Sequence, residues 1–274
     1  MTPDWLSVHR GPAPLIVSFP HTGTEIPDAY RPGLVSMWQA RRDCDWWIEQ
    51  LYDFAASLGA TTIRTTISRT IIDVNRDPSG VSLYPGQATT ELCPTTTFDG
   101  APLYKPGHAP DANEISRRRT TYFDPYHTAL AGEIDRLRAA HPKIVLYDCH
   151  SIRSVIPRLF DGELPTFNIG TNSGAACAPA LEATVVARCA AAPGMSHVAN
   201  GRFKGGYITR YHGNPAAGVH AVQMELACRG YMREPIPDVD ETNWPTPFEP
   251  AYAAPIRATL TAILEDCLTF ARKS

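Results

Sequence analysis

The chain has 274 residues, a length that one large α/β core can accommodate, and we expect a single domain spanning residues 1–274. A hydrophobic fraction of 43% and a charged fraction of 19% are typical of a folded globular protein. The formal net charge of −3 provides no basic excess for a phosphate backbone or an anionic membrane surface, so neither nucleic acid nor membrane partners are expected.

The seven cysteines are odd in number and contain no Cys-x-x-Cys pair, so the sequence indicates neither a disulfide framework nor a thiolate zinc site. The N-terminal segment lacks the basic and apolar regions of a secretion signal. No stretch approaches the roughly 20 apolar residues that a membrane-spanning helix needs. We therefore expect a cytoplasmic protein.

Short apolar runs rich in β-branched residues alternate with segments whose apolar residues recur at helical spacing. The pattern predicts strands at 14–20, 60–67, 70–74, 144–150 and 220–226. It predicts a helix at 45–58 that ends at Gly59, and a second helix that begins with a capping box at Asp111 and Glu114 and ends near residue 140. Two further helices are predicted near 177–191 and at the C-terminus, where the apolar face runs from Tyr252 to Leu268. The alternation indicates an α/β fold with a mixed, largely parallel central sheet and helices on both faces.

Two segments carry no strand or helix pattern. Residues 77–110 are dense in Gly, Pro, Thr and Asp, and loops of this length inside a compact enzyme are usually functional. We predict that this segment covers an active site. The Pro-rich segment 233–250 is expected on the surface, where it could support a subunit contact in a homo-oligomer.

Two histidines occupy the positions where a covered sheet places its active site. His21 follows the apolar run 14–20, and His150 ends the run 144–150. Imidazoles and carboxylates suit Zn²⁺, and a catalytic zinc usually has three protein ligands and one open position. We predict that both histidines bind zinc. His197, His212 and His220 remain candidates for supporting or substrate-binding groups.

The third zinc ligand should be a carboxylate from Glu25, Asp43, Asp45 or Asp148, and we favour Asp45. Glu25 lies in a predicted loop, so its spacing from the first histidine carries no helical argument. Asp45 lies at the start of the predicted helix 45–58, where the equally plausible alternative is an N-cap that binds backbone N–H groups.

Glu225 lies among apolar residues of a predicted strand, where a carboxylate must be paired or have a raised pKa. We predict a general base, and the alternative is a salt bridge to a nearby arginine. Cys149 or Ser151 offers a rival, nucleophilic mechanism. Neighbouring side chains on a strand point to opposite faces, so neither residue should meet the His150 imidazole as an activating partner.

Arginine is the side chain best shaped to bind a carboxylate with two hydrogen bonds. Several such cations would suit a small-molecule dicarboxylate substrate. We expect Arg117, Arg118 and Arg119 to be solvated on an exposed helix face. The predicted substrate-binding residues are Asn75 and five arginines, Arg69, Arg76, Arg153, Arg202 and Arg210.

Six segments together resemble the N-formylglutamate amidohydrolase family: PLIVSFPHTG, DCDWWIEQLYDF, SRTIIDVNR, LYDCHSIRSVIPRLFDGELPTFNIGT, NGRFKGGYITRYHG and HAVQMELA. The match runs through most of the chain. A weaker resemblance reaches the zinc carboxypeptidases, whose motifs place a metal histidine, an Asn-Arg pair, a second metal histidine and a late catalytic glutamate in that order. This chain has His21, Asn75 with Arg76, His150 and Glu225 in the same order.

The resemblance implies a zinc-carboxypeptidase-like (phosphorylase/hydrolase-like) fold and zinc-dependent hydrolysis of N-formyl-L-glutamate to formate and L-glutamate, the last step of histidine degradation. The zinc would be held by His21, Asp45 and His150, with Glu225 as the base. The carboxypeptidase motif His-x-x-Glu is not matched, because Glu25 lies four residues after His21, and this is a second reason to prefer Asp45. The alternatives are an amidohydrolase or carboxypeptidase acting on another N-acyl acidic amino acid, and a non-enzymatic metabolite-binding module.

Overall fold

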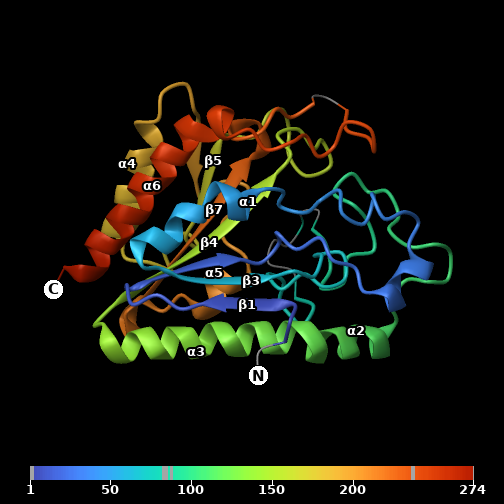
Figure 1. Cartoon of the computed structure of the whole chain (residues 1–274), viewed down its shortest axis with the longest axis horizontal. Helices are drawn as coiled ribbons and strands as arrows, with labels where there is room; N and C mark the ends of the chain where they lie inside the picture. Colours follow the sequence, from blue (N-terminus) through green and yellow to red (C-terminus); the bar gives the residue numbers. More distant parts are fainter. Residues whose placement is uncertain (1–2, 82–85, 87–88, 236–237, 274) are drawn as a thin grey trace.

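The structure, a computed structural model, describes residues 3–81, 86, 89–235 and 238–273. A seven-stranded sheet forms its centre, and four neighbouring strands in the middle are parallel (Figure 1). At the edges, β1 runs antiparallel to β3, and the parallel pair of β5 and β6 runs antiparallel to β7. This confirms the predicted mixed, largely parallel sheet. In spatial order the strands are β1 (Leu6–His9), β3 (Thr61–Thr65), β2 (Leu15–Phe19), β4 (Ile144–Ile152), β7 (Val219–Ala227), β5 (Phe167–Gly170) and β6 (His197–Ala199).

Helices cover both faces of the sheet (Figure 1). On one face lie α2 (Ala112–Arg118) and α3 (Asp124–Ala140), joined by a π-helical turn (Arg119–Phe123), together with the short α5 (Tyr207–His212). On the other face lie α4 (Pro179–Ala190), α6 (Pro250–Arg272) and the short α1 (Ile48–Leu51). Short 3₁₀ turns occupy Asp28–Gly33, Asp53–Leu58, Pro215–Ala217 and Cys228–Gly230.

Alternating residues of the central strands pack into two separate cores. In β4, Val145 and Tyr147 face the α4–α6 side, whereas Ile144 and Leu146 face the α3 side. Every residue of β4 and of β7 is buried, as expected for parallel strands covered on both faces. The two predicted strands 144–150 and 220–226 are thus confirmed, each slightly longer than its apolar run.

The segment 45–58 is not the single helix that its apolar spacing predicts. Trp47 adopts a left-handed conformation with φ of 63°, α1 lasts four residues, and a 3₁₀ turn follows. Gly59 ends this turn with φ of 73°, which confirms the predicted stop. Apolar residues such as Leu51 and Ala55 still face the core. The apolar spacing therefore predicted correctly which residues are buried, but the prediction of one regular helix is wrong.

The predicted strand at 70–74 is wrong. This segment forms turns, in which the Ile71 N–H donates to the Ser68 carbonyl and the Asp73 N–H to the Leu92 carbonyl. Ile71, Ile72 and Val74 are nevertheless almost fully buried. Their β-branched side chains fill the core beneath loops. The segment therefore has the composition of a buried strand although it forms turns.

The predicted helix 111–140 begins as expected, because the Asp111 carboxylate accepts the N–H of Glu114. Arg118 corrects the expectation that all three arginines of this helix are solvated. Its side chain is buried and donates to the Ile71 carbonyl and the Tyr104 hydroxyl.

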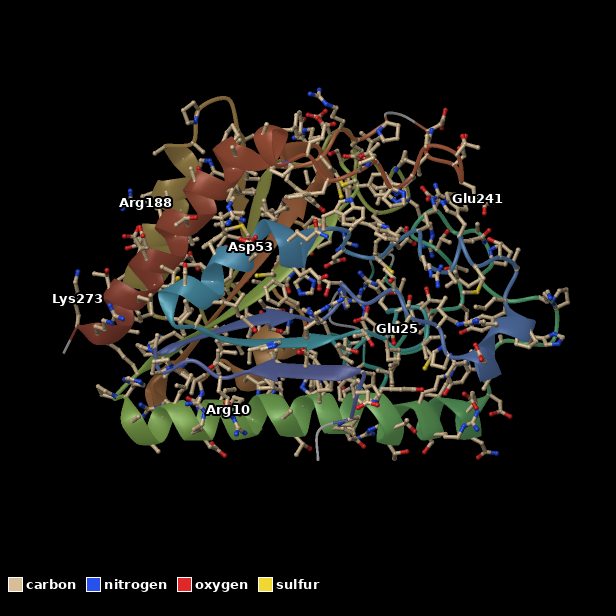
Figure 2. The ribbon with its side chains drawn as sticks, viewed as in Figure 1. Arg10, Glu25, Asp53, Arg188, Glu241 and Lys273 are labelled. Carbon is tan, nitrogen blue, oxygen red and sulfur yellow. The ribbon has the colours of Figure 1, made fainter. Side chains whose placement is uncertain are left out.

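Further along this face, Arg10 lies beside α3 and donates to the buried Glu133 carboxylate at 2.7 Å (Figure 2).

The two loop segments differ in how they pack. In 77–110, residues 82–85 and 87–88 lie outside the described residues, and the described part holds only isolated bridges. In 233–250, residues 236–237 lie outside them. The expected surface position of that segment is wrong for Trp244, which is 3% exposed and donates its indole N–H to the Arg42 carbonyl.

Among the described helices, none is long and apolar enough to cross a membrane.

Replacing Leu146 with Ala should lower the free energy of unfolding by about 2–5 kcal/mol, because the side chain is fully buried in the α3-side core. Denaturant titration followed by circular dichroism would measure the loss. Val35→Ala is the matched control, since Val35 is 45% exposed and should change stability by no more than about 0.5 kcal/mol. Equal effects of the two changes would contradict the assigned core.

Candidate functional site

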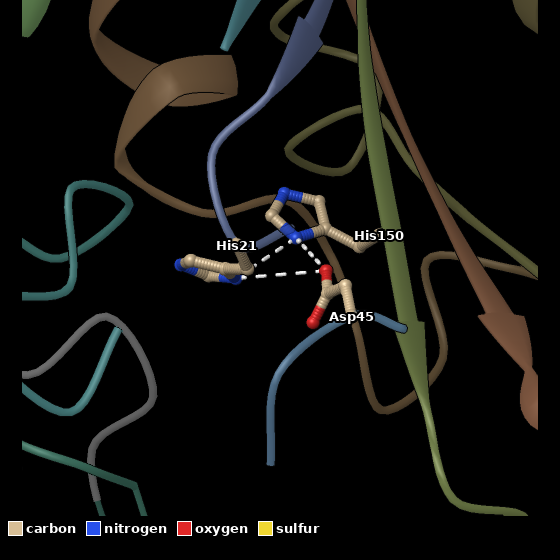
Figure 3. A group of neighbouring side chains, drawn as sticks. All are labelled: His21, Asp45 and His150. Atoms are coloured by element: carbon tan, nitrogen blue, oxygen red, sulfur yellow. Dashed lines mark hydrogen bonds and ion pairs between the residues drawn. The ribbon is translucent and has the colours of Figure 1, made fainter. Parts of the chain in front are cut away.

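Two imidazoles and one carboxylate converge on a single point (Figure 3). His21 follows β2, Asp45 precedes α1, and His150 lies in β4; all three are buried. The Nδ1 atoms of the two histidines are 3.1 Å apart, and Asp45 Oδ2 is 3.2 Å from Nδ1 of His150 and 3.8 Å from Nδ1 of His21. The structure thus brings together the three residues that the sequence predicts as a metal site.

The cluster fits a tetrahedral divalent cation. Ligand atoms at about 2.0–2.1 Å from Zn²⁺ lie about 3.3 Å from one another, which is close to the separations seen here. Asp45 Oδ1 is buried and, among the described residues, has no hydrogen-bond partner. Although burial opposes a charged ring, the Asp148 and Asp45 carboxylates hold the pKa of His150 well above its usual range. This point therefore favours positive charge, which a metal ion would supply.

The other proposed carboxylate ligands have other partners. Glu25 is exposed and accepts a hydrogen bond from the Thr66 hydroxyl (Figure 2). Asp43 accepts the N–H of Phe98 at 2.7 Å, and Asp148 binds the far side of the His150 ring. The capping alternative for Asp45 is wrong, since the helix begins only at Ile48.

Each histidine is held by a second carboxylate. Asp73 Oδ1 lies 2.6 Å from Nε2 of His21, and Asp148 Oδ2 lies 2.9 Å from Nε2 of His150. Such contacts fix the ring and its tautomer, leaving Nδ1 for a metal. Burial and then the charge of Arg69 lower the pKa of His21, which favours a neutral ring. The role of Asp73 was not predicted from the sequence, where its signal is its place two residues before Asn75.

Glu225 faces the cluster from the neighbouring strand, because β4 and β7 pair in register with His150 opposite Glu225. Burial raises the pKa of Glu225 to about 7, against the opposing charge of His150. The alternative of a salt bridge finds no support in the part of the chain that the structure describes, where no arginine lies within 4.0 Å of this carboxylate. Among the described residues, the Glu225 carboxylate accepts a side-chain hydrogen bond from the Gln223 amide, at 3.3 Å.

A pocket of about 570 Å³, partly open to solvent, lies over the cluster and Glu225. Its walls combine cations with apolar side chains, and the segment 77–110 contributes Thr89, Thr90 and Phe98. A concave lining that joins apolar side chains with a few charged groups is typical of a small-molecule site.

The structure divides the predicted substrate-binding residues. Among the described residues, the pocket lining includes Asn75, Arg69, Arg76 and Arg202 and does not include Arg153 or Arg210. Arg153 pairs with Asp99, and the Arg210 guanidinium donates to the Gly205 carbonyl. The sequence alone could not predict which of these arginines line the pocket, because each lies beside a predicted loop.

The rival nucleophiles point away from the cluster. Cys149 belongs to the core on the α4–α6 side, and burial raises the pKa of its thiol well above the usual range. The Ser151 hydroxyl accepts a hydrogen bond from Tyr231 at 2.8 Å. This agrees with the alternation of side chains along β4.

Comparison with known proteins gives a consistent family. The sequence profile of the N-formylglutamate amidohydrolase family matches residues 13–232. The N-formylglutamate deformylase of Pseudomonas aeruginosa is 48% identical over 268 residues, which cover 98% of this chain and 97% of that relative. The N-formylglutamate deformylase of Pseudomonas putida is 51% identical over 265 residues, covering 97% and 96%.

Solved structures share the fold. The crystal structure of N-formylglutamate amidohydrolase from Ralstonia eutropha JMP134 superposes with a TM-score of 0.76 at 23% identity, covering 97% of this chain and 98% of that one. The gene product Atu2144 from Agrobacterium tumefaciens has a TM-score of 0.70 at 18% identity, covering 98% and 96%. The profile match and the two Pseudomonas relatives confirm the resemblance in the sequence: the chain belongs to the N-formylglutamate amidohydrolase family of amide-bond hydrolases.

Proposed function

We propose that the protein hydrolyses N-formyl-L-glutamate to formate and L-glutamate with one bound zinc ion. The observation that carries this proposal is the convergence of His21, Asp45 and His150 beside Glu225, beneath a pocket lined with arginines. The two Pseudomonas relatives, both named N-formylglutamate deformylase, support the choice of substrate.

His21, Asp45 and His150 would hold the zinc, and their two nitrogens and one oxygen are donors that Zn²⁺ accepts. When bound, zinc supplies Lewis acidity toward a carbonyl oxygen and toward water. Asp73 and Asp148 keep the two rings oriented from behind.

Glu225 acts as the general base and then as the general acid. Its carboxylate takes a proton from the attacking water, whose oxygen forms a bond to the formyl carbon. Glu225 returns that proton to the amide nitrogen as the C–N bond breaks, so formate and the free amine leave. Its raised pKa, about 7, suits a group that must accept and release a proton near neutral pH.

Arg76 and Arg202 would bind the two carboxylates of the substrate, with Arg69 adding positive charge to the same wall. The Arg69 guanidinium is held by Asp73 at 2.7 Å and lies over the Phe98 ring, so its position is fixed before substrate arrives. Asn75 also lines the pocket, although its side-chain oxygen and nitrogen both hydrogen-bond within the protein.

The proposed cellular setting is the cytoplasm and the last step of histidine degradation. All seven cysteines are free and buried, which suits a reducing compartment. The substrate assignment, together with the family resemblance, supports the pathway.

The direct test is formate release from N-formyl-L-glutamate by the purified protein, before and after removal of metal by a chelator. We expect release that chelation abolishes and about one equivalent of zinc restores. Release that persists after complete metal removal would contradict zinc dependence. Absence of formate with zinc bound would contradict the substrate.

Replacing Arg202 with Ala should raise KM for N-formyl-L-glutamate by about 10- to 100-fold, because a charged hydrogen bond is lost. For N-formyl-L-glutamine, which keeps the α-carboxylate but has a neutral side chain, the rise in KM should be much smaller. Arg188→Ala is the matched control, because Arg188 lies on α4 and pairs with Asp266 at the surface (Figure 2). An unchanged KM would contradict the role of Arg202, and equal losses for both compounds would assign it to the carboxylate they share.

A further inference from the structure

Gln223 lies two residues before Glu225 in β7, so both side chains project from the same face of the sheet. Both are buried, with exposed fractions of 3% and 8%. The Gln223 Nε2 atom donates to Oε2 of Glu225 at 3.3 Å. A neutral amide thus contacts the carboxylate that the proposed reaction uses as its base.

The orientation of the Gln223 amide is determined by its other neighbours. Its oxygen accepts the backbone N–H of Gly206 at 2.7 Å and the side-chain N–H of Asn75 at 3.4 Å. Both neighbours are donors, so the amide oxygen must face them and the amide nitrogen must face Glu225. A flipped amide would lose these bonds and bring two oxygens together at Glu225.

The donors themselves are held in place. The Asn75 side-chain oxygen accepts the N–H of Ile208 at 2.8 Å, and the Asn75 carbonyl accepts the N–H of Tyr207 at 3.1 Å. A side chain at Gly206 would collide with that of Asn75, so the loop before α5 approaches this closely only because residue 206 is glycine. A continuous set of oriented amides therefore runs from the start of α5 to the Glu225 carboxylate.

We propose that Gln223 is a positioning residue that fixes the Glu225 carboxylate through Oε2 and leaves Oε1 to exchange the proton. This inference rests on the proposed function. Proton transfer requires the base within hydrogen-bond reach of the water, and a displacement of 1 Å can cost about 100-fold in rate. A neutral donor holds the carboxylate without adding a charge beside it.

Two substitutions separate positioning of Glu225 from support of the loop. Gln223→Met keeps the length of the side chain and removes its hydrogen bonds to Gly206, Asn75 and Glu225. Gln223→Glu keeps an oxygen for the Gly206 N–H and removes the donor to Glu225. We expect both variants to lower kcat by about 10- to 100-fold, with KM changed by less than about twofold and zinc content unchanged.

Glu225→Gln defines the kcat that remains without the base. Tyr147→Phe is the matched control, because it removes one buried hydrogen bond, to Tyr52, from the opposite face of β4. Its kinetics should equal those of the wild type. A Gln223→Glu variant with wild-type kcat would overturn the proposal, because Gln223 would then only support the loop.

Crystal structures of the wild type and of Gln223→Met give a readout that does not depend on activity. The Glu225 carboxylate should be ordered within hydrogen-bond distance of Gln223 in the wild type and displaced or disordered in the variant, with the β7 backbone unchanged. An unmoved carboxylate would overturn the proposal. If the wild type releases no formate, the proposed function fails, and this structural comparison still decides the role of Gln223.

Discussion

The parallel register between β4 and β7 is the constraint on which the site depends. It sets Asp148 opposite Gln223 and His150 opposite Glu225, and all four side chains share the face that carries the α3-side core nearer the start of the strands. A shift of one residue in either strand would turn its polar pair into the α4–α6 core. Burial of both faces therefore specifies the register, and the register places these four polar side chains together at the site.

The site also shows how buried charge is balanced. Asp45, Asp73, Asp148 and Glu225 are all buried close to one another, and Arg69 is a buried cation beside Asp45 and Asp73. Contacts with His21 and Arg69 hold the pKa of Asp73 well below its usual range despite burial, whereas at Glu225 burial outweighs the charges of His150 and Arg69 and raises the pKa. In the proposed mechanism, this one group of carboxylates is divided between orienting metal ligands and exchanging a proton. A divalent cation at the cluster would complete the balance.

The sequence predicted the central strands because a strand buried on both faces appears as a continuous apolar run. It missed the short strands β1, β5 and β6, which include polar residues such as Asn168 and the exposed His197. It also misassigned 70–74, where apolar β-branched residues pack beneath loops. The pairing of Asp45 with His150 spans 105 residues, so no local pattern could report it. Asp45 was preferred because it begins the predicted helix 45–58 and because Glu25 does not match the carboxypeptidase motif. Gln223 and Asp73 could have been predicted, because each lies two residues before a predicted site residue. Which arginines line the pocket depends on loop paths that composition does not specify.

His21, Asp45 and His150 are proposed to bind one zinc ion beside Glu225. Diffraction data collected on both sides of the zinc absorption edge, from crystals of the zinc-loaded protein, test it most directly. We expect one anomalous peak about 2.0–2.2 Å from Nδ1 of both histidines and from an Asp45 oxygen. A peak bound elsewhere, or no peak between these three residues, would contradict the account.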